Sequence, residues 1–192
     1  MKVLIVYAHP NPNSFNHAIL EAVVESLRLS KHEPRVKDLY EEKFNPLLDR
    51  DMLALINKGV IPRDILREQQ HILWAEGLIF IYPLWWFDRP AILKGWFDRV
   101  FTNGFAFRYT SRGVEGLLHH KKALVLVTTG GTVEEYGSIE DQECLIRPTT
   151  DGTLAACGVK NIVDKVFYAV PIVSDESRKG MLEDVRRLVG KF

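Results

Sequence analysis

The sequence has few of the features that mark metal-binding or disulfide-rich proteins. It contains only two cysteines in 192 residues, and Cys144 and Cys157 stand outside any CxxC or Cys/His spacing that would bind zinc. We therefore expect no metal site. Without a secretory signal, two thiols indicate a reducing compartment in which both are small core residues. A disulfide between them is the rarer alternative.

Long apolar runs are missing as well. The opening run MKVLIVYAHP stops at His9, which makes it too short for a signal peptide, and it lacks a small-residue cleavage site. No apolar run approaches the roughly 18 residues that span a bilayer. We expect a cytoplasmic protein that is not inserted in a membrane.

The chain also lacks an excess of charge of either sign. Its 25 basic residues balance its 25 acidic residues, giving a formal net charge of +0. A nucleic-acid partner, which would favour a basic surface, is therefore not expected. The balance also argues against a one-electron carrier that docks through a strongly acidic face. With 46% apolar and 26% charged residues, the composition is that of a folded globular protein, and the length favours one domain.

Short apolar runs alternate with amphipathic segments along the chain. The runs are rich in β-branched residues, as is typical of strands buried on both faces of a parallel sheet. This alternation predicts an α/β fold with right-handed crossovers and helices on both faces. Residues 41–61 are expected to be irregular with at most one helical turn, and 144–157 to be helical but interrupted at Pro148. The expected strands are 2–8, 33–40, 77–83, 121–129 and 160–170, and the expected helices are 14–29, 62–74, 90–101 and 175–192.

Ligands bind such sheets beyond the carboxyl ends of the strands, so the loops there are the first places to search. The loop HPNPNSFN (9–16) brings small hydroxyl and amide side chains to a helix N-terminus, whose free N–H groups and dipole favour a phosphate. Ser14 and Asn16 can donate to phosphate oxygens, and His9 can add a partly charged hydrogen bond. A helix cap followed by a turn is the alternative interpretation.

The loop PLWWFDRP (83–90) contains three consecutive aromatic residues, Trp85, Trp86 and Phe87. Core packing explains most aromatic residues in proteins. Neighbouring side chains diverge, however, so three in a row cannot all point inward from a loop. At least one is expected to line a crevice, where it can stack on a flat ring system.

The loop TTGGTVEEY (128–136) contains two adjacent glycines. Gly130 and Gly131 allow close backbone approach and unusual dihedral angles, so their N–H groups can point at a ligand, and Tyr136 can add a hydrogen bond. Alone, this loop is more simply interpreted as a turn. Together the three loops describe a site with a phosphate end, an aromatic wall and a donor-rich edge. Those features suit flavin mononucleotide (FMN), a cofactor that carries redox chemistry itself.

Four stretches of the chain, in the same order, resemble the NAD(P)H:quinone oxidoreductase (DT-diaphorase) family of flavodoxin-like proteins. The bacterial branch of that family includes the general stress protein 14 group and an ancillary oxidoreductase of glutathione-gated potassium efflux. The resemblance implies one flavodoxin-like domain over residues 1–192, with a five-stranded parallel sheet in the order 2-1-3-4-5. The matching stretches are AHPNPNSFN, DLYEEKFNPLLDRDM, YPLWWFDRPAILKGWFDRVFTNGFAFRY and TTGGTVEEY.

The resemblance also implies roles for individual residues. Tyr136, Trp86, Phe87 and Tyr109 would take part in catalysis, and Tyr136 matches a tyrosine at the flavin edge that is thought to relay charge during hydride transfer. Phe107 and Tyr109 would cover the substrate from the partner subunit of a homodimer. The implied cofactor-binding residues are His9, Ser14, Phe15 and Asn16 at the phosphate and ribityl chain, Pro83, Leu84, Trp85, Trp86 and Phe87 at the isoalloxazine, and Thr128, Thr129, Gly130, Gly131 and Tyr136 at its pyrimidine side.

The activity implied is a two-electron, ping-pong transfer of hydride from NADH or NADPH through the flavin to quinones or similar flat electrophiles. FMN is expected rather than FAD, because the chain lacks the long C-terminal extension of the mammalian enzymes. Two alternatives from other classes stay open. One is a regulatory partner of a potassium-efflux antiporter, and the other is a flavodoxin-type one-electron carrier.

Two residues depart from the family pattern. Gln142 stands where the mammalian enzymes have a histidine six residues after the tyrosine, and an amide does not titrate near neutral pH. Phe107 stands where they have a tyrosine, which removes one hydroxyl from the substrate cover. Hydride transfer to the flavin is compatible with both changes, which bear on substrate preference and rate.

Overall fold

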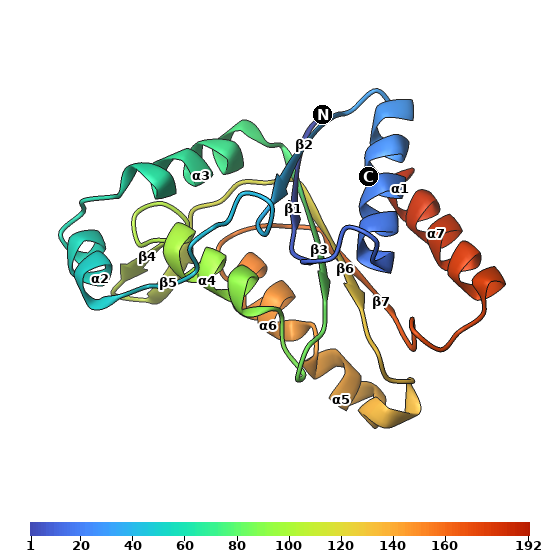
Figure 1. Ribbon diagram of the computed structural model, residues 1–192. Coiled ribbons are helices and arrows are strands. Elements are labelled where there is room, and N and C mark those ends of the chain that lie inside the picture. The colour runs from blue at the N-terminus through green and yellow to red at the C-terminus, as the bar shows by residue number, and fades with distance from the viewer.

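Five parallel strands form one twisted sheet in the order β2-β1-β3-β6-β7 (Figure 1). The computed structural model describes the backbone of residues 1–192 and all side chains except those of residues 139 and 140. Counted without the two strands of a separate hairpin, the order is 2-1-3-4-5, so the predicted fold class is confirmed. The strands are β1 (Lys2–Tyr7), β2 (Glu33–Asp38), β3 (Gly77–Pro83), β6 (Lys122–Thr128) and β7 (Ile162–Phe167).

Side chains alternate between the two faces of this sheet, and both faces are buried. In β3, Leu78, Phe80 and Tyr82 point to one hydrophobic cluster, whereas Ile79 and Ile81 point to the other. All seven residues of β3 are buried, which explains why its sequence is a continuous apolar run. A sheet covered in this way leaves only its edges and strand ends for polar chemistry.

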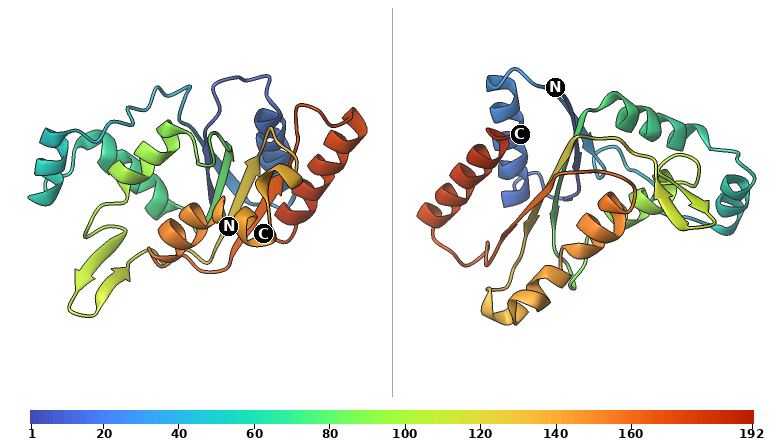
Figure 2. Two further views of the ribbon diagram at one scale, coloured as in Figure 1. Left: turned by 90° about the horizontal axis from the view of Figure 1, so that it is seen from below. Right: turned by 180° about the vertical axis from the view of Figure 1, so that it is seen from behind.

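Helices cover the two faces in separate layers (Figures 1 and 2). On one face lie α1 (Phe15–Leu29) and α7 (Asp175–Val189), which begin after the capping residues Ser14 and Ser174. On the other lie α3 (Arg63–Trp74) and α4 (Ala91–Val100), with the short α6 (Arg147–Thr149) and the π-helical η2 (Thr150–Ala155). In the described part of the chain, no helix is long and apolar enough to cross a bilayer.

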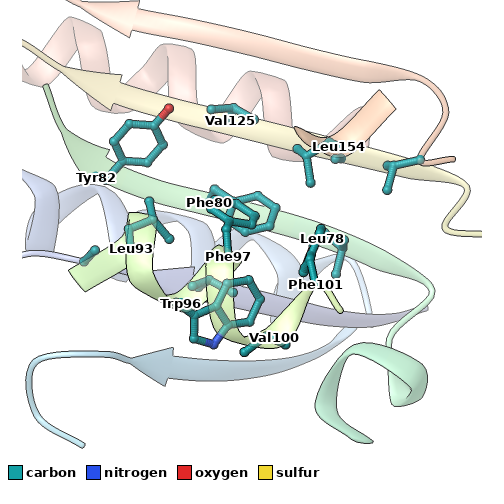
Figure 3. Packing of buried hydrophobic residues seen from close by; sticks show 14 of the residues in the cluster. Leu78, Phe80, Tyr82, Leu93, Trp96, Phe97, Val100, Phe101, Val125 and Leu154 are labelled. Atoms are coloured by element: carbon teal, nitrogen blue, oxygen red, sulfur yellow. The ribbon is translucent and has the colours of Figure 1, made fainter. Parts of the chain in front are cut away.

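The helix that follows the aromatic loop, α4, packs tightly against the sheet. Figure 3 shows Trp96 and Phe97 of α4 against Phe80 of β3, and the Phe80 ring centroid lies 6.2 Å from Trp96 and 5.3 Å from Phe97. The indole Nε1 of Trp96 donates to Oε2 of buried Glu68 in α3 at 3.0 Å. The bulky residues of "AILKGWFDRVF" therefore belong to the core.

The structure differs from the sequence-based expectation in three segments. Residues 41–61 contain α2 (Arg50–Asn57), two turns long, which begins after Asp49 and buries none of its residues. Residues 107–116 form an antiparallel hairpin of β4 (Phe107–Thr110) and β5 (Gly113–Gly116) that stands apart from the sheet. Both lack a buried face, so the hydrophobic pattern that predicts an element is weak there.

The third difference lies between β6 and β7. Pro148 occupies the first turn of α6, where its missing N–H costs no hydrogen bond, so it ends one helix and starts another. The segment includes a short 3-10 turn, η1 (Glu134–Tyr136), and α5 (Ile139–Cys144) before α6. The last strand also ends at Phe167 rather than at residue 170, because the chain turns there at Ala169, whose φ is 54°.

Replacing Phe80 by alanine tests the core. The side chain is fully buried between β3 and α4, so Phe80→Ala should lower the free energy of unfolding by about 3–5 kcal/mol. Leu29→Ala, in the same protein, removes a side chain that is 78% exposed and should change it by less than about 0.5 kcal/mol. Urea unfolding followed by circular dichroism measures both. Equal effects would contradict this description of the core.

Candidate functional site

A cavity of about 610 Å³ lies at the carboxyl ends of β1, β3 and β6, beside the point where the strand order reverses. Loops from four strands meet there. The structure brings together nearly every cofactor-binding residue predicted from the sequence, and of these only Phe87 does not line the cavity. The lining residues are His9, Asn11, Ser14, Phe15, Asn16, Pro83, Leu84, Trp85, Trp86, Thr128, Thr129, Gly130, Gly131, Tyr136, Val170 and Pro171.

One end of the cavity is the N-terminus of α1. Ser14 caps the helix, and its Oγ accepts the N–H of His17 at 3.2 Å. The N–H groups of Phe15 and Asn16 have no protein acceptor among the described residues, and the first turn carries no acidic side chain. Free N–H groups and an uncompensated helix dipole make this end a place for an anion.

His9 is held beside the helix end by Asn11. Its Nδ1 accepts the N–H of Asn11 at 3.0 Å, and the ring lies 5.9 Å from that of Trp85. Burial lowers the pKa of His9 below its ordinary value. This shift favours the neutral form of the imidazole, which can still hydrogen-bond to a ligand.

Asn16 is 4% exposed and connects the first turn of α1 to the end of β6. Its Nδ2 donates to Oγ1 of Thr128 at 2.7 Å, while its Oδ1 has no partner among the described residues. With the amide turned by 180°, the oxygen accepts from the Thr128 hydroxyl and the NH₂ group is free to donate to a ligand. An unsatisfied buried polar atom at the wall of a cavity is a mark of a binding site.

The three aromatic residues form a tight reverse turn. Trp85 and Asp88 exchange two backbone hydrogen bonds, of 2.9 and 3.1 Å, around Trp86 and Phe87. The central residues have φ values of 50° and 62°, as in a type I′ turn. That turn normally contains Asn-Gly, because a left-handed backbone costs a residue with a Cβ about 1–2 kcal/mol.

The strain of this turn is not offset by packing. The Trp86 side chain is 97% exposed and that of Phe87 63% exposed, although the Phe87 ring lies edge-on to Tyr136 with centroids 5.4 Å apart. Nothing in the fold of this chain requires a bulky residue at either position. Strained, exposed residues beside a cavity indicate a functional constraint.

Gly131 lies in a crowded position, against the side chains of Glu135 and Tyr136. A Cβ there would lie 2.8 Å from Oε2 of Glu135 and 3.1 Å from Cε2 of Tyr136, whereas a Cβ on Gly130 would meet nothing within 4 Å. Neither glycine has a positive φ, so the prediction that they have unusual dihedral angles was wrong. The positive φ angles beside the cavity belong to Trp86 and Phe87 instead. The N–H groups of Gly130 and Gly131 have no acceptor among the described residues.

Gln142 fastens the turn that carries Tyr136. Its Nε2 donates to the carbonyls of Gly137 at 3.1 Å and Val133 at 3.4 Å, and its Oε1 accepts the hydroxyl of Tyr168 at 3.5 Å. The Tyr168 ring lies 5.8 Å from Tyr136. The residue that replaces the family's histidine thus contacts the backbone on both sides of Tyr136.

Phe107 and Tyr109 do not reach this cavity in their own chain. They lie on β4 and line a different cavity of about 520 Å³, together with Arg89, Phe97 and Cys157. Tyr109 is exposed, and its ring packs against Phe107 with centroids 5.5 Å apart. Their predicted role at a partner's site remains a prediction.

Sequence reasoning missed three residues that line the larger cavity. Asn11 lies in the loop after β1, between the predicted residues His9 and Ser14. Val170 and Pro171 belong to the loop after β7. The main chain of the loop after β7 is hydrogen-bonded to the loop after β6, since the N–H of Ala169 donates to the carbonyl of Gly131 at 2.8 Å. A search of all loops at the carboxyl ends would have included it.

The strand order and the cavity at the switch point of the sheet define a flavodoxin-like protein. The sequence model described as "Flavodoxin-like fold" matches residues 1–189. The chain belongs to this family.

Individual relatives are more specific. Ribosyldihydronicotinamide dehydrogenase [quinone] of Homo sapiens is 40% identical over 201 residues, covering 94% of this chain and 87% of that protein. A Haemophilus influenzae protein named as an uncharacterized NAD(P)H oxidoreductase is 36% identical, with 95% and 91% covered. The structure of NAD(P)H:quinone oxidoreductase from Methanothermobacter marburgensis has a TM-score of 0.88 at 35% identity, covering 99% and 96%. The resemblance noted in the sequence, and the expectation of an oxidoreductase, are confirmed.

Trp86→Asn tests whether the left-handed backbone at this position is strained. Asparagine tolerates a left-handed backbone, and the exposed indole has little packing to lose. The change should leave the free energy of unfolding unchanged or raise it by up to about 1 kcal/mol, as measured by urea unfolding of the ligand-free protein. Leu47→Asn, at an exposed loop residue without a positive φ, is the control and should stay within about 0.5 kcal/mol. A clear loss of stability in Trp86→Asn alone would contradict the strain argument.

Proposed function

We propose that the protein is an FMN-dependent NAD(P)H:quinone oxidoreductase that transfers two electrons by a ping-pong reaction. The observation that carries the proposal is the composition of the larger cavity. A helix N-terminus, an aromatic turn and two glycine N–H groups meet around one space of about 610 Å³. That volume is within the range of small-molecule sites.

The residues present fit FMN. The phosphate would lie at the start of α1, where Ser14, Asn16 and free N–H groups are neutral donors and the helix dipole supplies the positive potential. No lysine or arginine lines the cavity in the described part of the chain, so the phosphate would be held by hydrogen bonds rather than ion pairs. The ring system would lie against Trp85 and Trp86.

When bound, FMN supplies the acceptance and release of hydride. The chain orients the ring and the substrate, since effective catalysis depends on fixed geometry. The N–H groups of Gly130 and Gly131 are placed to stabilise negative charge at the pyrimidine side. Tyr136 stands at the far edge of the cavity, against Phe87, where its hydroxyl is available to a substrate oxygen. Quinones and nicotinamide would occupy the same open face in turn, next to Trp86.

A homodimer would complete this site. Trp86 and Tyr109 are both largely exposed, and so are the α2 side chains Leu53 and Leu55. We propose that Phe107 and Tyr109 of the β4–β5 hairpin cover the substrate position of the partner subunit. This arrangement explains why these residues stand apart from the larger cavity of their own chain.

Reconstitution tests the function directly. The purified protein incubated with FMN should bind it, quench its fluorescence and oxidise NADH or NADPH when a quinone is added. Parallel incubations with FAD decide between the two flavins, and initial rates at varied quinone should give the parallel lines of a ping-pong reaction. Protein that leaves FMN fluorescence unchanged and NAD(P)H unoxidised would overturn the proposal.

Tyr109→Ala separates substrate cover from cofactor binding. Because Tyr109 lies outside the FMN cavity of its own chain, the Kd for FMN should change by less than about twofold. Loss of an aromatic contact of about 1–1.5 kcal/mol should lower kcat/KM for the quinone about tenfold. Val114→Ala, on the same hairpin, is the matched control. An unchanged kcat/KM in Tyr109→Ala would contradict the partner's contribution.

A further inference from the structure

Both ends of the aromatic turn are attached to the same hydroxyl group. On the strand side, the hydroxyl of Tyr82 donates to Oγ1 of Thr149 at 2.9 Å. On the helix side, Nη1 of Arg89 donates to the same Oγ1 at 3.2 Å. Thr149 belongs to α6, more than 50 residues away in sequence and 2% exposed.

Arg89 is held in place more completely than a surface arginine. Its Nη1 also lies 3.2 Å from the carbonyl of Pro148 and 3.2 Å from Oγ1 of Thr153. The side chain is 7% exposed, and its guanidinium carbon lies 5.1 Å from the centroid of the Phe97 ring. Hydrogen bonds from a charged donor and a cation–π contact make this an expensive group to displace, although its buried Nε has no hydrogen-bond partner among the described residues.

The arginine is directly joined to the strained turn. The N–H of Arg89 donates to Oδ1 of Asp88 at 2.7 Å, and Asp88 closes the turn through its two hydrogen bonds to Trp85. Trp86 and Phe87 are themselves too exposed to fix their backbone by packing. The restraint on the turn must therefore come from its ends. The strand end is held independently, because β3 pairs with β1 and β6 along its length.

We propose that Arg89 is a positioning residue for the ligand site: bound to Thr149, Thr153 and the Pro148 carbonyl, its guanidinium holds Trp86 and Phe87 in the left-handed turn that faces the cavity. Arg89 does not line the FMN cavity and would not touch the flavin. The predicted effect of Arg89 on FMN binding rests on the proposed function. Its predicted effect on the conformation of the turn does not depend on FMN.

Hydrogen exchange in the protein without flavin tests the effect on the turn. Arg89→Met keeps the length of the side chain and removes its hydrogen bonds. The amides of Trp85 and Asp88 should exchange about tenfold faster, the change expected from losing a charge-assisted hydrogen bond of about 1.4 kcal/mol. The amides of β1 should keep their rates. Tyr82→Phe removes the other hydrogen bond to Thr149 and is the matched control, with wild-type exchange at both turn amides.

FMN titration supplies a second readout. Arg89→Met should raise the Kd for FMN about tenfold and weaken the visible circular dichroism of the bound flavin, and Tyr82→Phe should do neither. Unchanged turn amides in Arg89→Met, or faster exchange throughout the molecule, would overturn the inference. If the wild-type protein fails to bind FMN, the proposed function fails, while the exchange rates still decide whether Arg89 holds the turn.

Discussion

Burial of the parallel sheet on both faces is the constraint on which the rest of this protein depends. Central strands such as β3 present every side chain to a hydrophobic cluster, so the sheet leaves only its edges and strand ends for polar chemistry. At the carboxyl ends the order of strands reverses between β1 and β3, and the loops diverge to leave a cavity. The position of the cavity is thus a consequence of how the sheet is covered.

The character of that cavity follows from the elements that meet there. One helix begins at its edge with free N–H groups, and burial lowers the pKa of His9. Backbone dipoles at this end of the cavity favour an anion, without the desolvation cost of a buried cation. The positive charge next to the aromatic turn is that of Arg89, and its Nη1 donates to Thr149 and Thr153 within the protein.

The aromatic turn is where local rules are broken. Type I′ turns favour small or flexible residues, yet this one contains tryptophan and phenylalanine at positive φ. Their exposure removes packing as the reason. A strained backbone persists only where its surroundings over-determine it. The surroundings here are the paired strand β3 on one side and the anchored guanidinium on the other.

The sequence by itself determined the α/β class, the five strands and the loops that carry the ligand site, because apolar runs and helical periodicity are local signals of burial. It also pointed to Asn16, Trp86 and Gly131. Only the tertiary structure decided that the unusual dihedrals belong to Trp86 and Phe87 rather than to the glycines, since backbone strain depends on how the turn is held at both ends. The exposed α2 and the β4–β5 hairpin lack a buried face and so left little periodic signal. The contact of Arg89 with Thr149 joins residues 60 apart in sequence, and no local pattern records it.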